Sequence, residues 1–285
     1  MRAARRVLAL GLVAAILPGM AAASAAPAKP QRILSMNQCT DLLVLQLVPK
    51  ARIAGVTYLA RDGAQALFPG AASGIPVNYG TPEDILKFRP DLILASDFSL
   101  AVTRRLAREV GAPIVEVRSA TTFDDIRRSL RQVGAAVGEP GRAEALVRGM
   151  DAQLAELAAR APARPVRVVA WDGGETVPGT ETLANHILQA AGAVNIAAQP
   201  GVTFTGFDVE RLLQANPEAL LYGGGTRPLV QNDESRHRVI RRVFAGRRIA
   251  YPEVAFNCGL PQSAKAAVDL RRRLDALPSR RTGER

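Results

Sequence analysis

Histidine, cysteine and lysine are scarce in this chain of 285 residues, which contains two His, two Cys and four Lys. With only two histidines, His186 and His237, in separate segments, a zinc or manganese site built on several histidines is not expected. The glycine-rich signatures of nucleotide binding and the Gly-x-Ser-x-Gly elbow of hydrolases are also absent. None of the motifs in the sequence indicates a catalytic site. We therefore expect a protein that is not an enzyme and needs no cofactor.

Acidic residues are fewer than basic ones, with 26 Asp and Glu against 37 Lys and Arg and a net charge of +11. Such an excess is typical of proteins that bind nucleic acids or anionic membranes. Three of the arginines lie before residue 27, and the tail 278–285 holds a surplus of two more. The densest run, residues 236–248, places Arg238, Arg241 and Arg242 on one helical face, as on a solvated surface. We therefore expect no nucleic-acid partner.

The first 26 residues have the layout of a secretory signal peptide. Arg2, Arg5 and Arg6 precede an apolar run, and Ala23-Ser24-Ala25 offers a cleavage site near Ala25/Ala26. The apolar run is too short for a membrane-spanning helix, and no cysteine follows it for lipid attachment. We expect export to a bacterial periplasm.

Short apolar strands alternate with amphipathic helices after residue 30, which predicts parallel sheets covered by helices on both faces. Strands are expected at 32–36, 52–56, 91–95, 113–117, 166–170, 219–222 and 248–251, and helices at 41–48, 82–88, 100–110, 123–137, 142–160, 183–191, 209–215 and 262–274. The composition, 48% hydrophobic and 22% charged, is that of a folded chain, and the length allows one or two domains.

The predicted fold is α/β with two lobes, residues 27–138 and 161–277, a ligand cleft between them and a flexible tail at 278–285. One long backbone helix within residues 139–160 joins the lobes. The helix expected at 142–160 is about 28 Å long at 1.5 Å per residue, and its apolar residues form a single stripe. This stripe comprises Ala143, Leu146, Val147, Met150, Leu154 and Leu157. A helix of this kind is a stiff connection.

Residues 83–94 align with residues 210–221 at a constant offset of 127. Each copy places a Glu, Glu83 or Glu210, seven residues before a Pro, then an acid and an apolar strand. Taken alone, either glutamate can serve only to offset the dipole of its helix. The matching placement in both lobes weakens that interpretation.

Ligands of open parallel sheets bind beyond the carboxyl ends of the strands. Aromatic walls with a few Arg and amide groups suit a bulky, partly apolar or anionic small molecule. The candidate ligand-binding residues at these loops are Asn37, Cys39, Tyr58, Arg61, Tyr79, Asp97, Phe98 and Arg118 in the first lobe, and Trp171, Thr176, Thr180, Phe204, Phe207, Arg227 and Cys258 in the second.

The two cysteines, Cys39 and Cys258, lie in different lobes. An even count in an exported protein favours a disulfide, which would tie the lobes together. Both residues also fall on predicted cleft loops, where free thiols would lie near the ligand. The sequence leaves the two alternatives open, because geometry decides between them.

Several sequence features occur together in this chain. They are the signal peptide, the segment Arg32-Ile-Leu-Ser-Met-Asn-Gln-Cys-Thr-Asp41, the repeated Glu and Pro positions, the backbone helix, Gly179-Thr180-x-Thr182 and Cys258-Gly-x-Pro261. In these features, residues 31–277 resemble the periplasmic substrate-binding proteins of ABC importers for iron–siderophores, haem and cobalamin. The resemblance implies a monomeric two-lobed binder that closes little and presents one Glu per lobe, Glu83 and Glu210, to a permease dimer in the inner membrane.

Within this family, an anionic ferric siderophore is the first expectation, with Arg61, Arg118 and Arg227 as contacts. For cobalamin, Trp171, Tyr79 and Phe98 would stack on the corrin edge. Haem is disfavoured by the lack of a cleft His, although Tyr58 or Tyr79 offers an iron ligand. The alternative from another class is an exported redox enzyme that uses Cys39 and Cys258.

Overall fold

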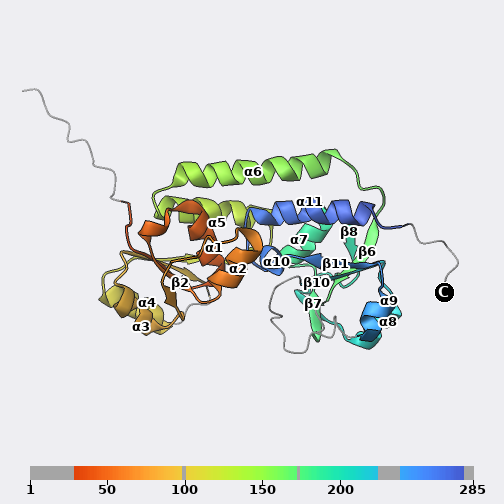
Figure 1. The fold of residues 1–285 in the computed structure, drawn as a ribbon, viewed down its shortest axis with the longest axis horizontal. Helices are drawn as coiled ribbons and strands as arrows, with labels where there is room; N and C mark the ends of the chain where they lie inside the picture. The colour runs from red at the N-terminus through yellow and green to blue at the C-terminus, as the bar shows by residue number, and fades with distance from the viewer. Residues whose placement is uncertain (1–28, 98–100, 172–173, 224–237, 279–285) are drawn as a thin grey trace, which may run out of the picture.

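The computed structural model describes residues 29–97, 101–171, 174–223 and 238–278. Two α/β lobes lie next to each other, with one long helix along the side that both share (Figure 1). The predicted signal peptide and all but the first residue of the predicted tail lie outside the described residues. No helix in the described ranges is long and apolar enough to cross a membrane.

The first lobe is built on a five-stranded parallel sheet in the order β3-β2-β1-β4-β5. Its strands are β1 (Ile33–Ser35), β2 (Ile53–Thr57), β3 (Val77–Asn78), β4 (Leu92–Ser96) and β5 (Ile114–Val117). Its helices are α1 (Gln38–Leu47), the short 3₁₀ turn Lys50–Arg52, α2 (Ala60–Leu67), α3 (Pro82–Phe88), α4 (Ala101–Glu109) and α5 (Phe123–Ala136). The strand order reverses direction at β1, whose neighbours are β2 and β4.

The second lobe holds a four-stranded parallel sheet, β11-β10-β6-β8, and a two-stranded antiparallel sheet, β7-β9. Its strands are β6 (Val166–Ala170), β7 (Thr176–Pro178), β8 (Ala193–Asn195), β9 (Phe204–Gly206), β10 (Ala219–Gly223) and β11 (Arg248–Tyr251). Its helices are α7 (Leu183–Ala190), α8 (Val209–Ala215), α9 (Arg238–Val243), α10 (Glu253–Asn257) and α11 (Gln262–Asp275).

The connecting helix α6 (Pro140–Ala159) contacts α5 of the first lobe and α11 of the second (Figure 1). Its buried residues Ala143, Val147, Met150 and Leu157 belong to the predicted apolar stripe. One cluster of buried side chains continues from the first lobe through this stripe into the second. Because the lobes share a core, large movements between them would expose apolar surface to water.

The predicted two-lobed α/β fold with mainly parallel sheets is confirmed. Helix α3 begins and ends where the sequence predicts, and α6 begins at Pro140 rather than at 142, since proline is favoured in a first helical turn. Helices α2, α9 and α10 and the short strands β3, β7, β8 and β9 are not among the elements predicted from the sequence. These elements are two to eight residues long, too short for a clear periodicity.

The sequence repeat corresponds to the same structure in both lobes, a short helix followed by a sheet strand. Helices α3 and α8 begin at Thr81 and Asp208, whose side chains cap the helix. They end at Arg89 and Asn216, in the left-handed region with φ of 45° and 40°. No other non-glycine residue of the described ranges has a positive φ. A proline follows each of them and prevents the helix from continuing.

The acid after each of these prolines anchors the start of the neighbouring strand. Asp91 accepts hydrogen bonds from the backbone N–H groups of Gln31, at 2.6 Å, and Arg32, at 2.9 Å. Glu218 accepts one from the backbone N–H of Arg167 at 3.0 Å. The side chains of Arg32 and Arg167 donate in turn to carbonyl groups at the ends of α3 and α8. The two lobes therefore share one local design.

Candidate ligand-binding cleft

Several predicted ligand residues line up along the carboxyl edge of the first sheet. In the order of the strands, Tyr79 follows β3, Tyr58 follows β2, Asn37 follows β1, Asp97 follows β4 and Arg118 follows β5. Ligands of open parallel sheets bind at this edge, where the strand order reverses. The structure therefore brings these five residues to one side of the lobe, as the sequence predicted.

A pocket of about 200 Å³ lies at the reversal point and is closed by the second lobe. Its first-lobe lining includes the predicted residues Asn37, Cys39 and Arg118. The second lobe contributes Asn257 and Gly259. The cavity is smaller than the roughly 300–1,000 Å³ typical of ligand sites, so by itself it is too small to enclose a ligand of ordinary size.

Sequence reasoning did not select several residues of this pocket, among them Ser96, Ser119 and Asn257. Ser96 ends β4 and therefore lies at the carboxyl edge, which was the available signal. Asn257 ends α10, a helix of five residues that the sequence did not indicate. Ser96, Ser119 and Asn257 add hydroxyl and amide groups to a pocket whose lining already includes the guanidinium group of Arg118.

Tyr58 and Tyr79 form an aromatic pair at the other end of the same edge. Their ring centroids are 5.8 Å apart, and the ring planes are inclined by 28°. The residues remain 53% and 70% exposed, so most of the pair's surface faces solvent. Aromatic side chains that keep so much surface exposed are typical of binding surfaces.

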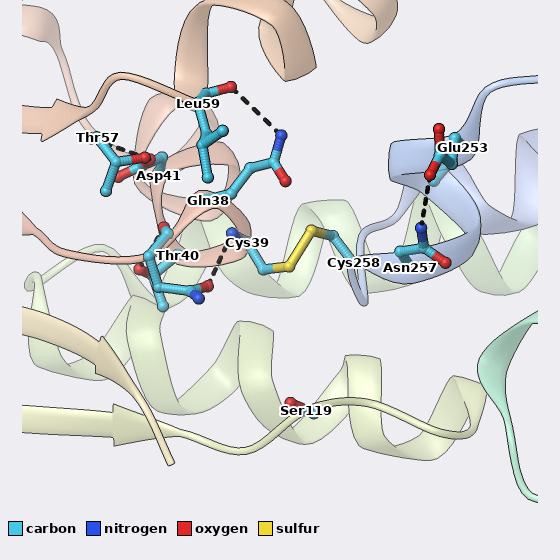
Figure 2. The surroundings of a disulfide bond; sticks show 12 residues. Gln38, Cys39, Thr40, Asp41, Thr57, Leu59, Ser119, Glu253, Asn257 and Cys258 are labelled. Carbon is cyan, nitrogen blue, oxygen red and sulfur yellow. Dashed lines mark hydrogen bonds between the residues drawn. A yellow bond between two sulfur atoms is a disulfide. The ribbon is translucent and has the colours of Figure 1, made fainter. Parts of the chain in front are cut away.

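A disulfide joins Cys39, in the first turn of α1, to Cys258, at the end of α10 (Figure 2). The bridge spans 219 residues of sequence and connects the two lobes. Of the two alternatives that the sequence left open, the structure therefore contains the disulfide and not the free thiols.

Two further contacts hold the lobes together next to the disulfide. The side-chain amide of Gln262 donates a hydrogen bond to that of Gln46 at 2.7 Å. Gly259 lies so close to Ala120 that a Cβ on the glycine would be 2.3 Å from the alanine Cβ. The floor of the cleft is therefore tightly fitted, and glycine is required at position 259.

Asp41 lies beneath this floor, fully buried in α1 (Figure 2). Burial raises the pKa of its carboxyl group from 3.8 to about 7, although the hydroxyl of Ser35 and hydrogen bonds from Thr57 offset part of the effect. One carboxyl oxygen accepts the backbone N–H of Thr57 at 3.1 Å and its hydroxyl at 2.5 Å. The other, Oδ1, has no partner among the described residues. Burial of the Asp41 carboxyl group is therefore unfavourable for the folded state, but its hydrogen bonds to Thr57 connect α1 to β2.

The expectation that Trp171 and Phe207 face the ligand is wrong. Trp171 is 1% exposed, and its indole N–H donates to the carbonyl groups of Gly174, at 3.0 Å, and Phe207, at 2.9 Å. Phe207 is buried in the same cluster, with Arg211 over its ring. Both aromatic side chains pack inside the second lobe. For Trp171 this is possible because carbonyl groups within reach accept the hydrogen bond of its buried indole N–H.

The segment around Thr180 builds the scaffold of the second lobe. Its hydroxyl donates to the carbonyl of Gln199, and its carbonyl accepts from the side chain of Asn185 at 3.1 Å. Asn195 donates to Asn185 and so joins β8 to the start of α7. These bonds explain the Gly-Thr-x-Thr pattern by structure alone. The hydroxyl of Thr180 is thus already paired.

The remaining candidates are scattered. Thr176 and Phe204 are exposed on the β7-β9 sheet, and Arg61 is exposed on α2. Asp97 accepts a long hydrogen bond from Ser119 at 3.4 Å. Phe98 and Arg227 lie outside the described residues. Within the described ranges, no group of three or more His, Cys, Asp or Glu residues is placed to hold a metal ion.

This architecture matches a known class of proteins. A profile of the periplasmic binding protein family covers residues 35–245. The chain belongs to this family. The resemblance inferred from the sequence motifs is thereby confirmed, and with it the assignment to substrate-binding proteins of the ABC-transporter type.

Individual relatives are distant. The chain is 29% identical over 221 residues to the vitamin B12-binding protein of Pectobacterium atrosepticum, which covers 74% of this chain and 77% of that protein. It is 25% identical over 210 residues to the Bacillus subtilis ABC transporter substrate-binding lipoprotein YvrC, covering 70% of this chain and 65% of that protein. Both relatives are therefore matched over most, but not all, of their length.

Solved structures share the fold. The apo form of the periplasmic haem-binding protein RhuT from Roseiflexus sp. RS-1 matches with a TM-score of 0.68 and 24% identity, over 86% of this chain and 98% of that one. The vitamin B12-binding protein BtuF of Vibrio cholerae matches with a TM-score of 0.65 and 17% identity, over 88% and 99%. At this level of identity, the similarity extends to the fold alone.

Proposed function

We propose that this periplasmic binding protein is not an enzyme and captures a metal chelate between its lobes for a membrane permease. The observation that carries the ligand class is the exposed Tyr58–Tyr79 pair, which lies on the same sheet edge as a small pocket lined partly by polar groups. Paired aromatic faces suit a broad, flat ligand, and a phenol oxygen is a suitable ligand for ferric iron. A metal tetrapyrrole, haem or a corrinoid, is therefore our first candidate.

The similar proteins support this order of candidates. Two of them are named for vitamin B12 binding and one for haem binding. The burial of Trp171 removes one of the three aromatics expected to stack on a corrin, whereas the two tyrosines expected for haem are both exposed. Haem is therefore favoured over cobalamin.

A ferric siderophore is the second candidate. Arg118 lines the pocket, and Arg61 is exposed on α2 of the same lobe. Guanidinium groups recognise anionic chelates through charge-assisted hydrogen bonds. A siderophore with several negative charges would use both arginines, and the tyrosine pair would contact its aromatic groups.

Delivery requires a docking site, for which Glu83 and Glu210 are our candidates. Both glutamates are exposed in the first turns of α3 and α8, and neither forms an ion pair within the described ranges. Figure 1 places these two helices toward opposite ends of the molecule, on the side away from α6. Two like acids in two like lobes fit two like permease subunits, each with a basic group.

The ligand is tested by titrating the purified protein with haemin, cyanocobalamin and a ferric tris-catecholate, followed by visible absorption. We expect haemin to bind one-to-one, and Tyr58→Phe or Tyr79→Phe to alter its spectrum. Tyr251→Phe, a change at a buried tyrosine, is the control. Failure of all three probes to bind, or their chemical conversion, would contradict the proposal. Binding of the catecholate alone would select the second candidate.

Docking is tested by uptake in cells. The double variant Glu83→Ala with Glu210→Ala should abolish uptake and leave ligand affinity unchanged. Glu144→Ala with Glu156→Ala, two changes on α6 at the other side of the molecule, is the matched control. Normal uptake by the first double variant would end the docking hypothesis.

A further inference from the structure

Each of the two docking helices exposes a leucine one turn after its glutamate. Leu86 follows Glu83 in α3 and is 54% exposed, and Leu213 follows Glu210 in α8 and is 41% exposed. Residues three apart on a helix share a face, so each leucine lies beside its glutamate. Each lobe therefore presents an acidic–apolar patch, which we define as Glu83 with Leu86 and Glu210 with Leu213.

The repeat explains why these leucines are unusual. A single exposed apolar side chain on a protein surface is ordinary. Between residues 83–94 and 210–221, only four aligned positions are identical: the glutamate, the exposed leucine, the proline and the final leucine. The proline stops the helix, and the final leucines, Leu94 and Leu221, are fully buried in their strands.

The remaining two identical positions form the acidic–apolar patches. Neither has a structural task that demands its side chain, because the core contacts of the helices come from their neighbours Ile85 and Leu212, both fully buried. Substitution of either leucine by a polar residue would cost little folding stability and would relieve an exposed apolar surface. Folding alone therefore does not account for a leucine at both positions.

We infer that the two patches are the contact points for the permease, with Leu86 and Leu213 each entering an apolar pocket next to the cationic group that meets the glutamate. This inference rests on the docking function proposed above and adds the apolar half of the interface. The repetition of the patch favours this partner, because like patches in two like lobes fit two like permease subunits. A buried leucine excludes water from the adjacent ion pair and strengthens it.

The test compares six purified proteins for binding to the permease complex in nanodiscs, without added chelate: the wild type, the two single leucine variants, the double leucine variant, the double glutamate variant and a double valine control. The permease is the one whose deletion abolishes uptake in the same cells. Single Leu86→Gln and Leu213→Gln changes should weaken binding about fivefold each, and the double variant about 25-fold, as expected for the loss of a half-buried leucine. Haemin titration and the thermal midpoint should stay at the wild-type values. The control is Val110→Gln with Val194→Gln, two similarly exposed residues outside the repeat.

Each outcome decides between the hypotheses. Wild-type binding by the double leucine variant, with binding lost in the double glutamate variant, overturns this inference and leaves the proposed docking function standing. Wild-type binding by both double variants overturns both. Equal loss in the valine control shows an unspecific surface effect and also overturns the inference. Sedimentation of the wild-type chain as a dimer that the leucine changes dissociate would make a second copy the occupant, with the same consequence.

Discussion

Removal of the disulfide between Cys39 and Cys258 should lower stability without unfolding the protein. The bridge closes a loop of 219 residues, for which chain entropy predicts about 5 kcal/mol of stabilisation, with 2–4 kcal/mol being typical of measured bridges. For a chain of this size, such a loss lowers the midpoint of thermal unfolding by about 10 °C. The shared core and the Gln46–Gln262 contact remain, so the reduced protein should stay folded at room temperature.

Calorimetry of the oxidised protein, the reduced protein and the double variant Cys39→Ala with Cys258→Ala measures this effect. Reductant should leave the double variant unchanged, which controls for side effects of the reagent. The unfolded, non-reduced protein should contain no reactive thiol. Ligand affinity should fall on reduction, because a looser cleft must be ordered on binding. A thermal midpoint that shifts by less than about 2 °C, with the bridge verified by mass spectrometry, would refute the chain-entropy argument.

Two other substitutions test the floor of the cleft. Gly259→Ala places a methyl group 2.3 Å from Ala120 and should cost about 1–3 kcal/mol in urea unfolding, whereas Gly149→Ala, with nothing within 4 Å, should stabilise α6 slightly. Equal stability of the two variants would disprove the tight fit. Burial raises the pKa of Asp41 from 3.8 to about 7, so between these pH values the carboxyl group is protonated in the folded state and ionised in the unfolded state. The free energy of unfolding should therefore fall as the pH rises through this window. Asp41→Asn should flatten that decline, and an unchanged slope between about pH 4.5 and about pH 7 would show that Asp41 is not its source.

Regular elements were predictable where they are long or carry clear signals. Helix α3 has a capping threonine, a proline in its first turn and a proline after its end, and its bounds were found without error. The apolar stripe of α6 predicted both the helix and its buried face. The β7-β9 sheet was not predicted, because its strands have three residues each and pair across 25 residues of intervening chain. No local sequence pattern indicates such a pairing.

The cleft was predictable in position and only partly in membership. Tyr58, Tyr79 and Asn37 follow predicted strands, and the topology of a parallel sheet places all three at one edge. Trp171 also follows a strand, but its orientation depends on two carbonyl groups, one of them 36 residues away at Phe207. Loop position alone does not reveal whether an aromatic ring turns outward or into the core.

The sequence by itself determined the alternation of strands and helices, the stiff connection between the lobes and the repeat that places Glu83 and Glu210 in like positions, because each is recorded in local spacing. Only the tertiary structure decided whether Cys39 and Cys258 are bonded, since the two cysteines are 219 residues apart and their approach depends on how the two lobes pack together. It also decided which of the equally apolar leucines in the repeat remain exposed. Exposure is a property of the assembled surface, and Leu86 and Leu213 differ from their buried neighbours only in the direction they face.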